Sequence, residues 1–260
     1  RTRMLPVLLS PQHDVAEAPA PGREEAALKL AASQAQARQA TSLFDAAKHG
    51  TATAFATAEA FRKLRTNLVY MRVDEPARVL VVTSPKPGDG KSTVAANLAA
   101  AIAASGQPTV LVDGDLRRPT VATNMGVDDQ LGVTDVLVGR LPLRDALQES
   151  EVPHLKVLAA GKIPPNPSEL LGSKAMRGLI AELAEQAMVI IDAPPLLAVT
   201  DGALLTASAD GAIVVISTGS TIDAELQTAL DNLRVVQGEA LGVVMNKASR
   251  RTMGGAYYYY

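Results

Sequence analysis

The chain has no cysteine, no tryptophan and only three histidines. The absence of cysteine excludes disulfides, a thiol nucleophile and cysteine-ligated metals. His13, His49 and His154 are scattered, so we interpret them as solvated loop residues rather than as catalytic groups or metal ligands. The chemistry must therefore come from carboxylates, hydroxyls, lysines or the backbone.

The sequence also lacks a long apolar run and a strong net charge. No stretch approaches the ~20 apolar residues that cross a bilayer, and the five-residue apolar stretch in "RTRMLPVLLS" is too short for a signal-peptide core. The formal net charge of −2 argues against nucleic acid as a partner. Because the chain begins with arginine, we expect it to be a soluble piece of a longer protein.

Aromatic residues are rare, and their distribution is uneven. The chain has five tyrosines, and four of them are the consecutive last residues Tyr257, Tyr258, Tyr259 and Tyr260. A tyrosine run on a loose end buries little surface, so its use is as a set of accessible hydroxyls. We expect residues 248–260, which show no periodicity, to form a flexible tail.

Most of the remaining sequence alternates short apolar runs with helical patterns. Residues 1–56 indicate a linker with a possible helix at 24–48. From residue 78, continuously apolar runs such as "RVLVVT", "PTVLVD" and "AMVIID" alternate with segments such as "SKAMRGLIAELAEQ". Such runs are typical of strands buried on both faces. We therefore predict one α/β domain at 57–247, doubly wound around a mostly parallel sheet.

A glycine-rich loop follows the first of these strands. "SPKPGDGKST" fits a phosphate-binding P-loop, although the usual first glycine is replaced by Pro85. Lys91 would meet the β- and γ-phosphates, and the Ser92 hydroxyl would ligate Mg²⁺. The alternative is a glycine-rich turn that only caps a helix. We expect the nucleotide to contact Pro87, Gly88, Asp89, Gly90, Lys91, Ser92 and Thr93.

Three aspartates follow the ends of two other strands. Asp113 and Asp115 follow the apolar run within "VLVDGDLRRP", and Asp192 ends "VIID". Ligands bind outside the carboxyl ends of parallel strands, so the three carboxylates should converge on the phosphate region. Each alone would be a capping residue. Because Mg²⁺ takes few direct protein ligands, we assign Ser92 to the metal, Asp113 and Asp192 to its waters, and Asp115 to the catalytic base.

Several stretches together resemble the bacterial tyrosine kinases (BY-kinases) of capsule and exopolysaccharide export. "TSPKPGDGKST" looks like their variant P-loop, "VLVDGDLRRPT" like their additional aspartate motif, and "VIIDAPP" like their Walker B motif. "GKIPPNPSELLGSKAM" and the tyrosine tail also fit. "EAFRKLRTN" matches the family's E-x-x-R-x-x-R pattern at Glu59, Arg62 and Arg65. The opening "RTRMLPVLLSP" resembles the segment after the second membrane helix of fused members.

The resemblance implies a P-loop NTPase fold of the MinD/ParA-like type that uses ATP and Mg²⁺. It implies catalysis by Lys91, Asp113, Asp115 and Asp192, with adenine contacted by Asn246. It implies autophosphorylation of the tyrosine cluster between subunits of a ring, which would regulate polysaccharide synthesis and export. The implied partners are other copies of the chain, a membrane modulator and a phosphotyrosine phosphatase, at the cytoplasmic face of the inner membrane.

Two other functions remain compatible with the P-loop. One is a positioning ATPase of the MinD or ParA class, whose members carry a lysine at the position of Lys86 that reaches across a dimer. The other is a scaffold that binds nucleotide without chemistry. Asp115, the E-x-x-R-x-x-R pattern and the tyrosine tail favour the kinase.

Overall fold

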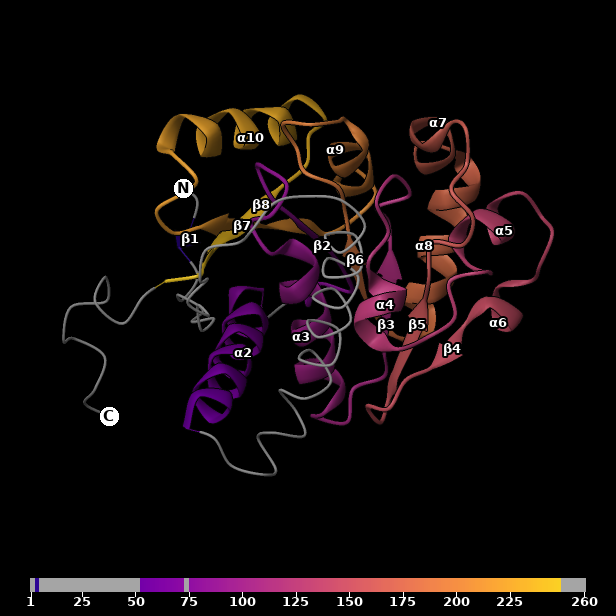
Figure 1. Cartoon of the computed structure of the whole chain (residues 1–260), viewed down its shortest axis with the longest axis horizontal. Coiled ribbons are helices and arrows are strands. Elements are labelled where there is room, and N and C mark those ends of the chain that lie inside the picture. The colour runs from indigo at the N-terminus through magenta and orange to yellow at the C-terminus, as the bar shows by residue number, and fades with distance from the viewer. Residues whose placement is uncertain (1–2, 5–51, 73–74, 249–260) are drawn as a thin grey trace, which may run out of the picture.

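The computed structural model describes residues 3–4, 52–72 and 75–248 (Figure 1). The possible helix at 24–48 and the tyrosines at 257–260 lie outside the described residues. No helix within the described part is both long and apolar enough to span a bilayer.

A single sheet forms the centre of the described chain, with the strand order β1-β8-β7-β2-β6-β3-β5-β4. All neighbouring strands are parallel except the edge pair β4 and β5. The strands are β1 (Arg3–Met4), β2 (Val79–Thr83), β3 (Thr109–Asp113), β4 (Gln148–Glu149), β5 (Leu155–Leu158), β6 (Met188–Asp192), β7 (Gly211–Ser217) and β8 (Ala240–Asn246).

Helices connect the parallel strands, and α2 packs on α3 at one side of the sheet (Figure 1). Four of the described helices have 13 or more residues, and the others have four to six. The helices are α2 (Ala52–Met71), α3 (Lys91–Ala103), α4 (Val121–Met125), α5 (Val133–Leu137), α6 (Leu143–Ala146), α7 (Pro167–Leu171), α8 (Lys174–Gln186), α9 (Asp201–Thr206) and α10 (Asp223–Val235).

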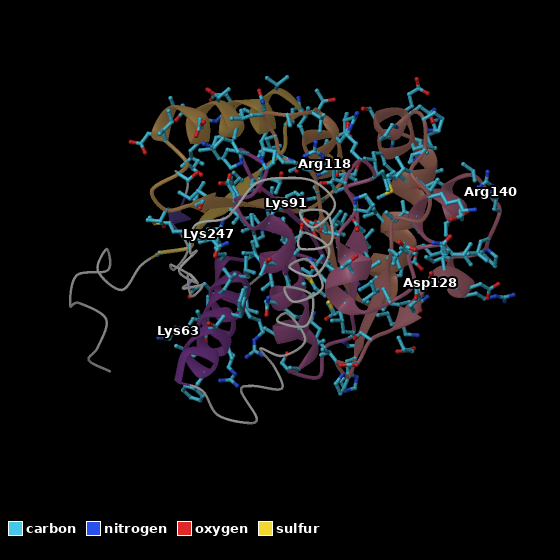
Figure 2. The ribbon with its side chains drawn as sticks, viewed as in Figure 1. Lys63, Lys91, Arg118, Asp128, Arg140 and Lys247 are labelled. Carbon is cyan, nitrogen blue, oxygen red and sulfur yellow. The ribbon has the colours of Figure 1, made fainter. Side chains whose placement is uncertain are left out.

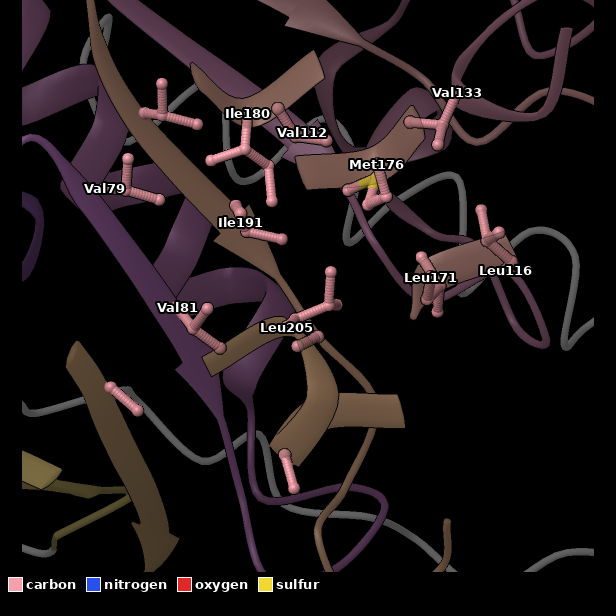
Figure 3. Close-up of a cluster of buried hydrophobic side chains, with 14 of the residues drawn as sticks. Val79, Val81, Val112, Leu116, Val133, Leu171, Met176, Ile180, Ile191 and Leu205 are labelled. Carbon is pink, nitrogen blue, oxygen red and sulfur yellow. The ribbon is translucent and has the colours of Figure 1, made fainter. Parts of the chain in front are cut away.

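Alternate residues of the strands enter two separate cores, because successive side chains point to opposite faces of a sheet. In β2, Leu80 and Val82 belong to the core shared with α2 and α3. Val79 and Val81 belong to the opposite core, which includes Ile180 of α8 (Figure 3). A strand that is buried on both faces must be apolar at every position, as the sequence pattern indicated.

The structure confirms the doubly wound, mostly parallel α/β fold. Ala60, Leu64 and Leu68, spaced four residues apart on one face of α2, pack into the core that α2 shares with α3. Arg3–Met4, within the predicted linker, pairs as β1 with β8. The domain limits 57–247 stay a prediction. For comparison, the helix α2 begins at Ala52 and the last strand, β8, ends at Asn246.

Candidate nucleotide and catalytic site

The P-loop joins β2 to α3, and α3 begins at Lys91. Gly88 and Gly90 have left-handed backbones, with φ of 86° and 96°, which favour glycine. A Cβ on Gly90 would also lie 2.0 Å from the Asn246 Nδ2 atom. The first N–H groups of α3 lack intrahelical acceptors, and the helix dipole places positive charge at this end. The loop therefore has the local structure of a phosphate site.

Lys91 lies at the start of α3, near the middle of the sheet (Figure 2). Its Nζ atom is 2.9 Å from Asp115 Oδ2, 3.4 Å from Asp192 Oδ1 and 3.2 Å from the Ser92 hydroxyl. Burial lowers the pKa of Lys91, but the charges of Asp192 and Asp115 outweigh burial and raise the pKa above its ordinary value. Lys91 is thus a fixed cation among carboxylates.

The three predicted aspartates do converge at one edge of the sheet. Asp113 and Asp192 are direct partners in the register of β3 and β6 and are fully buried. Asp115 follows β3 by two residues and is also buried. The sequence prediction that strand ends bring these residues together therefore agrees with the geometry.

Asp113 also accepts hydrogen bonds from the backbone of the loop that follows β3, a contact that the sequence did not indicate. Its Oδ1 atom accepts a hydrogen bond from the Asp115 N–H at 3.1 Å. Its Oδ2 atom accepts from the N–H groups of Thr120 and Val121 at 3.0 and 2.9 Å. Asp113 therefore shapes the loop that carries Asp115, whose Oδ1 atom accepts in turn from the Arg118 N–H at 3.0 Å.

Electrostatics at this edge favour the arrival of a cation. Burial, followed by the charge of Asp192, raises the pKa of Asp113 to about 8. Burial also raises the pKa of Asp192, although Lys91 and Ser92 work in the opposite direction. The raised pKa values mean that burial and mutual repulsion disfavour full ionisation of these carboxyl groups, and a divalent cation would favour their ionised forms.

The residues fit Mg²⁺ bound mainly through water and phosphate. The buried Asp192 Oδ2 atom has no hydrogen-bond partner. The Ser92 hydroxyl and Asp192 Oδ1 both contact the Nζ atom of Lys91, so the two side chains lie near each other. Within the described ranges, no group of three or more acidic, histidine or cysteine side chains forms a preformed metal cage. This suits Mg²⁺, which keeps several waters and takes one or two protein ligands.

An ion-pair cluster beside the aspartates was not foreseen from the sequence. Arg117 Nε is 2.7 Å from Asp201 Oδ2, and the Ser168 hydroxyl donates to Asp201 Oδ1 at 2.6 Å. Arg117 Nη2 also donates to the Ser168 hydroxyl at 2.9 Å. The cluster ties the loop of Asp115 to the starts of α7 and α9. Residues so far apart in sequence carry no local signal of their contact.

Two predicted site residues have contacts on the β8 side of the P-loop. Asn246, expected at adenine, donates from Nδ2 to the Asp89 carbonyl at 3.0 Å and accepts at Oδ1 from the Lys247 N–H at 2.9 Å. The Asp89 side chain is held by neighbouring protein groups, so the contact of Asp89 with phosphate would be through its backbone.

Lys86, at the position of the cross-dimer lysine of MinD-type ATPases, is engaged within its own chain. Its Nζ atom is 2.8 Å from Glu225 Oε2 and donates to the Ser220 carbonyl at 2.9 Å. The side-chain hydrogen bond from Lys86 is also the main reason that the pKa of Glu225 is lowered.

The predicted assembly motif lies on α2, which packs against α3. Glu59 and Arg62 form an exposed ion pair of 2.8 Å, whereas Arg65 Nη1 donates to the Ala101 carbonyl of α3 at 3.2 Å. An exposed pair one helical turn apart contributes only ~0.3–0.5 kcal/mol to stability. Glu59 and Arg62 are therefore available to a partner, while Arg65 is partly used inside the subunit.

Comparisons with known proteins identify the family of the chain. Residues 77–240 match a family model described as an AAA domain. The chain is 42% identical over 202 residues to the tyrosine-protein kinase YwqD of Bacillus subtilis, covering 76% of this chain and 85% of that protein.

Solved structures give the same result. The kinase domain of the Escherichia coli tyrosine kinase ETK superposes with a TM-score of 0.73 at 31% identity, covering 79% of this chain and 81% of that one. The Mg-ADP complex of MinD from Pyrococcus horikoshii has a TM-score of 0.57 at 25% identity, covering 66% and 71%. With a P-loop, converging aspartates and this degree of identity to YwqD, the chain belongs to the bacterial tyrosine-protein kinases, built on a MinD-like P-loop fold.

Proposed function

We propose that this kinase uses ATP and Mg²⁺ to phosphorylate Tyr257–Tyr260 of a neighbouring copy of itself. The observation that carries the proposal is the cluster of Lys91, Asp115 and Asp192 at the edge of the sheet where β8 also ends. The chain continues from β8 to the tyrosines, so the acceptors are attached beside the same edge that holds the P-loop.

The residues of the cluster have distinct roles in transfer to a phenol. A tyrosine hydroxyl has a pKa near ~10 and is a poor nucleophile until its proton is accepted. Asp115 is buried and its carboxylate is held by Lys91 and the Arg118 N–H, which supports its role as the group that would accept that proton as the oxygen attacks the γ-phosphorus. The bond to the β-phosphate oxygen then breaks, giving ADP and phosphotyrosine. Mg²⁺, when bound, would neutralise charge on the phosphates.

The remaining contacts hold the phosphates in line for attack. Lys91 offers a point charge to the phosphates, and the N–H groups at the start of α3 offer hydrogen bonds. Ser92 and Asp192 would hold the metal and its waters, and Asp113 keeps the loop of Asp115 in place. Positioning and electrostatic stabilisation supply most of the acceleration in phosphoryl transfer.

The tail is long enough to extend well beyond the end of β8. An extended chain spans ~3.3–3.6 Å per residue, so the segment from Lys247 to Tyr260 covers roughly 40 Å or more. Four consecutive tyrosines allow one pocket to modify them in succession. Each phosphate adds about −1.5 to −2 charges, so a heavily modified tail would be repelled from the aspartates and released.

Release of the tails would let a ring of subunits come apart, which would make the kinase a switch between assembled and dispersed states. On this proposal the wider partners are those of the family resemblance: a membrane modulator, upstream on the same chain or separate, and a phosphotyrosine phosphatase. The site of action would be the cytoplasmic face of the inner membrane, and the process regulated would be exopolysaccharide or capsule export.

The variant Asp115→Asn tests the chemical role directly. The amide cannot accept the phenolic proton, so we expect tail phosphorylation to slow by about 10²–10⁴-fold. Affinity for a non-hydrolysable ATP analogue should stay within about threefold, because Lys91 and the P-loop remain. Quenched-flow labelling and calorimetric titration measure the two quantities. Phosphorylation at the parent rate would remove Asp115 from the mechanism.

The assembly motif has its own prediction. Replacing Glu59, Arg62 and Arg65 together by alanine should convert the oligomer to monomers, because the proposed docking contacts with the neighbour are lost. Static light scattering measures the mass. Lys63→Ala is the matched control, since Lys63 is an exposed cation on the same helix with no ion pair among the described residues (Figure 2). Identical masses for the triple variant and the parent would rule out this docking surface.

A further inference from the structure

Asp89 lies in the P-loop, where its carboxylate would repel phosphate if it faced the nucleotide. The residue is only 2% exposed. Its Oδ2 atom accepts a hydrogen bond from the Lys86 N–H at 3.0 Å, and its Oδ1 atom accepts from the Thr221 hydroxyl at 2.9 Å. The carboxylate is therefore fully engaged by protein donors.

Thr221 fixes this contact from outside the loop. It lies between β7 and α10, and its Oγ1 atom also accepts from the Ser217 N–H at 3.0 Å. That bond occupies a lone pair of the hydroxyl, so its single hydrogen is left for Asp89. Hydrogen bonds to a carboxylate are shorter and stronger than neutral ones. The pair thus links the P-loop to the end of β7.

Two further contacts hold the same turn by its carbonyl groups. Lys247 Nζ donates to the Gly88 carbonyl at 2.6 Å, and Asn246 Nδ2 donates to the Asp89 carbonyl at 3.0 Å. In a planar trans peptide the C=O and the following N–H point in opposite directions. Drawing these two carbonyls toward the end of β8 therefore turns the N–H groups of Asp89 and Gly90 away from β8.

We propose that Asp89 and Thr221 are positioning residues that hold the P-loop with its N–H groups ready for the phosphates of ATP. Neither side chain touches the nucleotide, and the effect is exerted through the backbone of the loop. The inference rests on the proposed function, because it takes the ligand to be ATP. Preorganisation of this kind lowers the entropic cost of binding rather than the chemical barrier.

The test compares Thr221→Val with Thr221→Ser. Valine keeps the shape of threonine but removes the hydroxyl, whereas serine keeps the hydroxyl. We expect the valine variant to raise the Kd for a fluorescent ADP analogue and the KM for ATP by about tenfold, while kcat stays within about twofold. Serine should restore both values. Glu225→Gln is the matched control, since it weakens only the side-chain contact of Lys86, while the amide oxygen can still accept from the Ile222 N–H and Asp89 and Thr221 are unchanged.

The outcomes distinguish a failure of the proposed function from a failure of the proposed role of Thr221 and Asp89. If the parent chain binds no ADP, the proposed function fails along with this inference. If the parent binds and the valine variant binds equally well, only the role of Thr221 and Asp89 is refuted. Equal losses in the valine and serine variants would also refute it. Asp89→Asn, which keeps an acceptor for Lys86, gives a second measurement if the valine variant does not fold, and should then raise the Kd as well.

Discussion

Lys91→Met is expected to abolish binding of Mg-ATP and, with it, phosphorylation of the tail. Lys91 is the cation closest to the expected phosphates and is held by two buried aspartates. Without it, Asp113, Asp115 and Asp192 lose the ammonium that lies among them. We expect affinity for a non-hydrolysable ATP analogue to fall by at least about 10²-fold, as befits a charge-assisted contact in a buried site.

Calorimetric titration measures that affinity, and thermal unfolding checks the fold. The unfolding measurement is needed because methionine leaves Asp115 and Asp192 without their ammonium partner, which destabilises a buried site. Lys91→Arg retains the charge and is the matched variant for stability. Unchanged affinity together with unchanged activity in the folded methionine variant would mean that this loop is not the nucleotide site.

Mixing two defective chains is expected to restore phosphorylation. One chain carries Lys91→Met and keeps its tyrosines, and the other is active but has Tyr257–Tyr260 changed to Phe. If tails enter neighbouring sites, phosphate appears on the Lys91→Met chain at a level approaching that of the parent. Each chain alone should incorporate none.

The two chains are distinguished by mass, so no tag is needed at the tail. Absence of label from both chains in the mixture, while the parent labels itself efficiently, would show that transfer occurs within one chain. The end of β8 lies beside its own P-loop, with Lys247 on the Gly88 carbonyl, so the intramolecular route is a real competitor that this experiment decides.

Much of this site could be predicted from sequence because each of its motifs is a short continuous stretch of residues. Asp113 and Asp192 end apolar runs, and parallel strands place their ends at one edge, so convergence follows from topology. Lys91 and Ser92 follow the glycines by fixed spacing. The two-faced burial of β2 and β3 was equally visible, since a strand with helices on both faces must be apolar at every position.

Other features depend on contacts between distant residues and left no local pattern. Thr221 lies 132 positions from Asp89 in the chain, and Arg117 lies 84 positions from Asp201. Helices as short as α4 and α6 are too short for a helical period to emerge. The antiparallel β4 has two residues, so its pairing with β5 is set by the loop around it.

The central claim is tested most directly by incubating the purified chain with Mg-ATP and mapping phosphate by intact mass and peptide sequencing. The proposed mechanism predicts successive additions of phosphate, all within the peptide that holds Tyr257–Tyr260, and none in the Lys91→Met variant. ATP consumption with no phosphate on that peptide would contradict it.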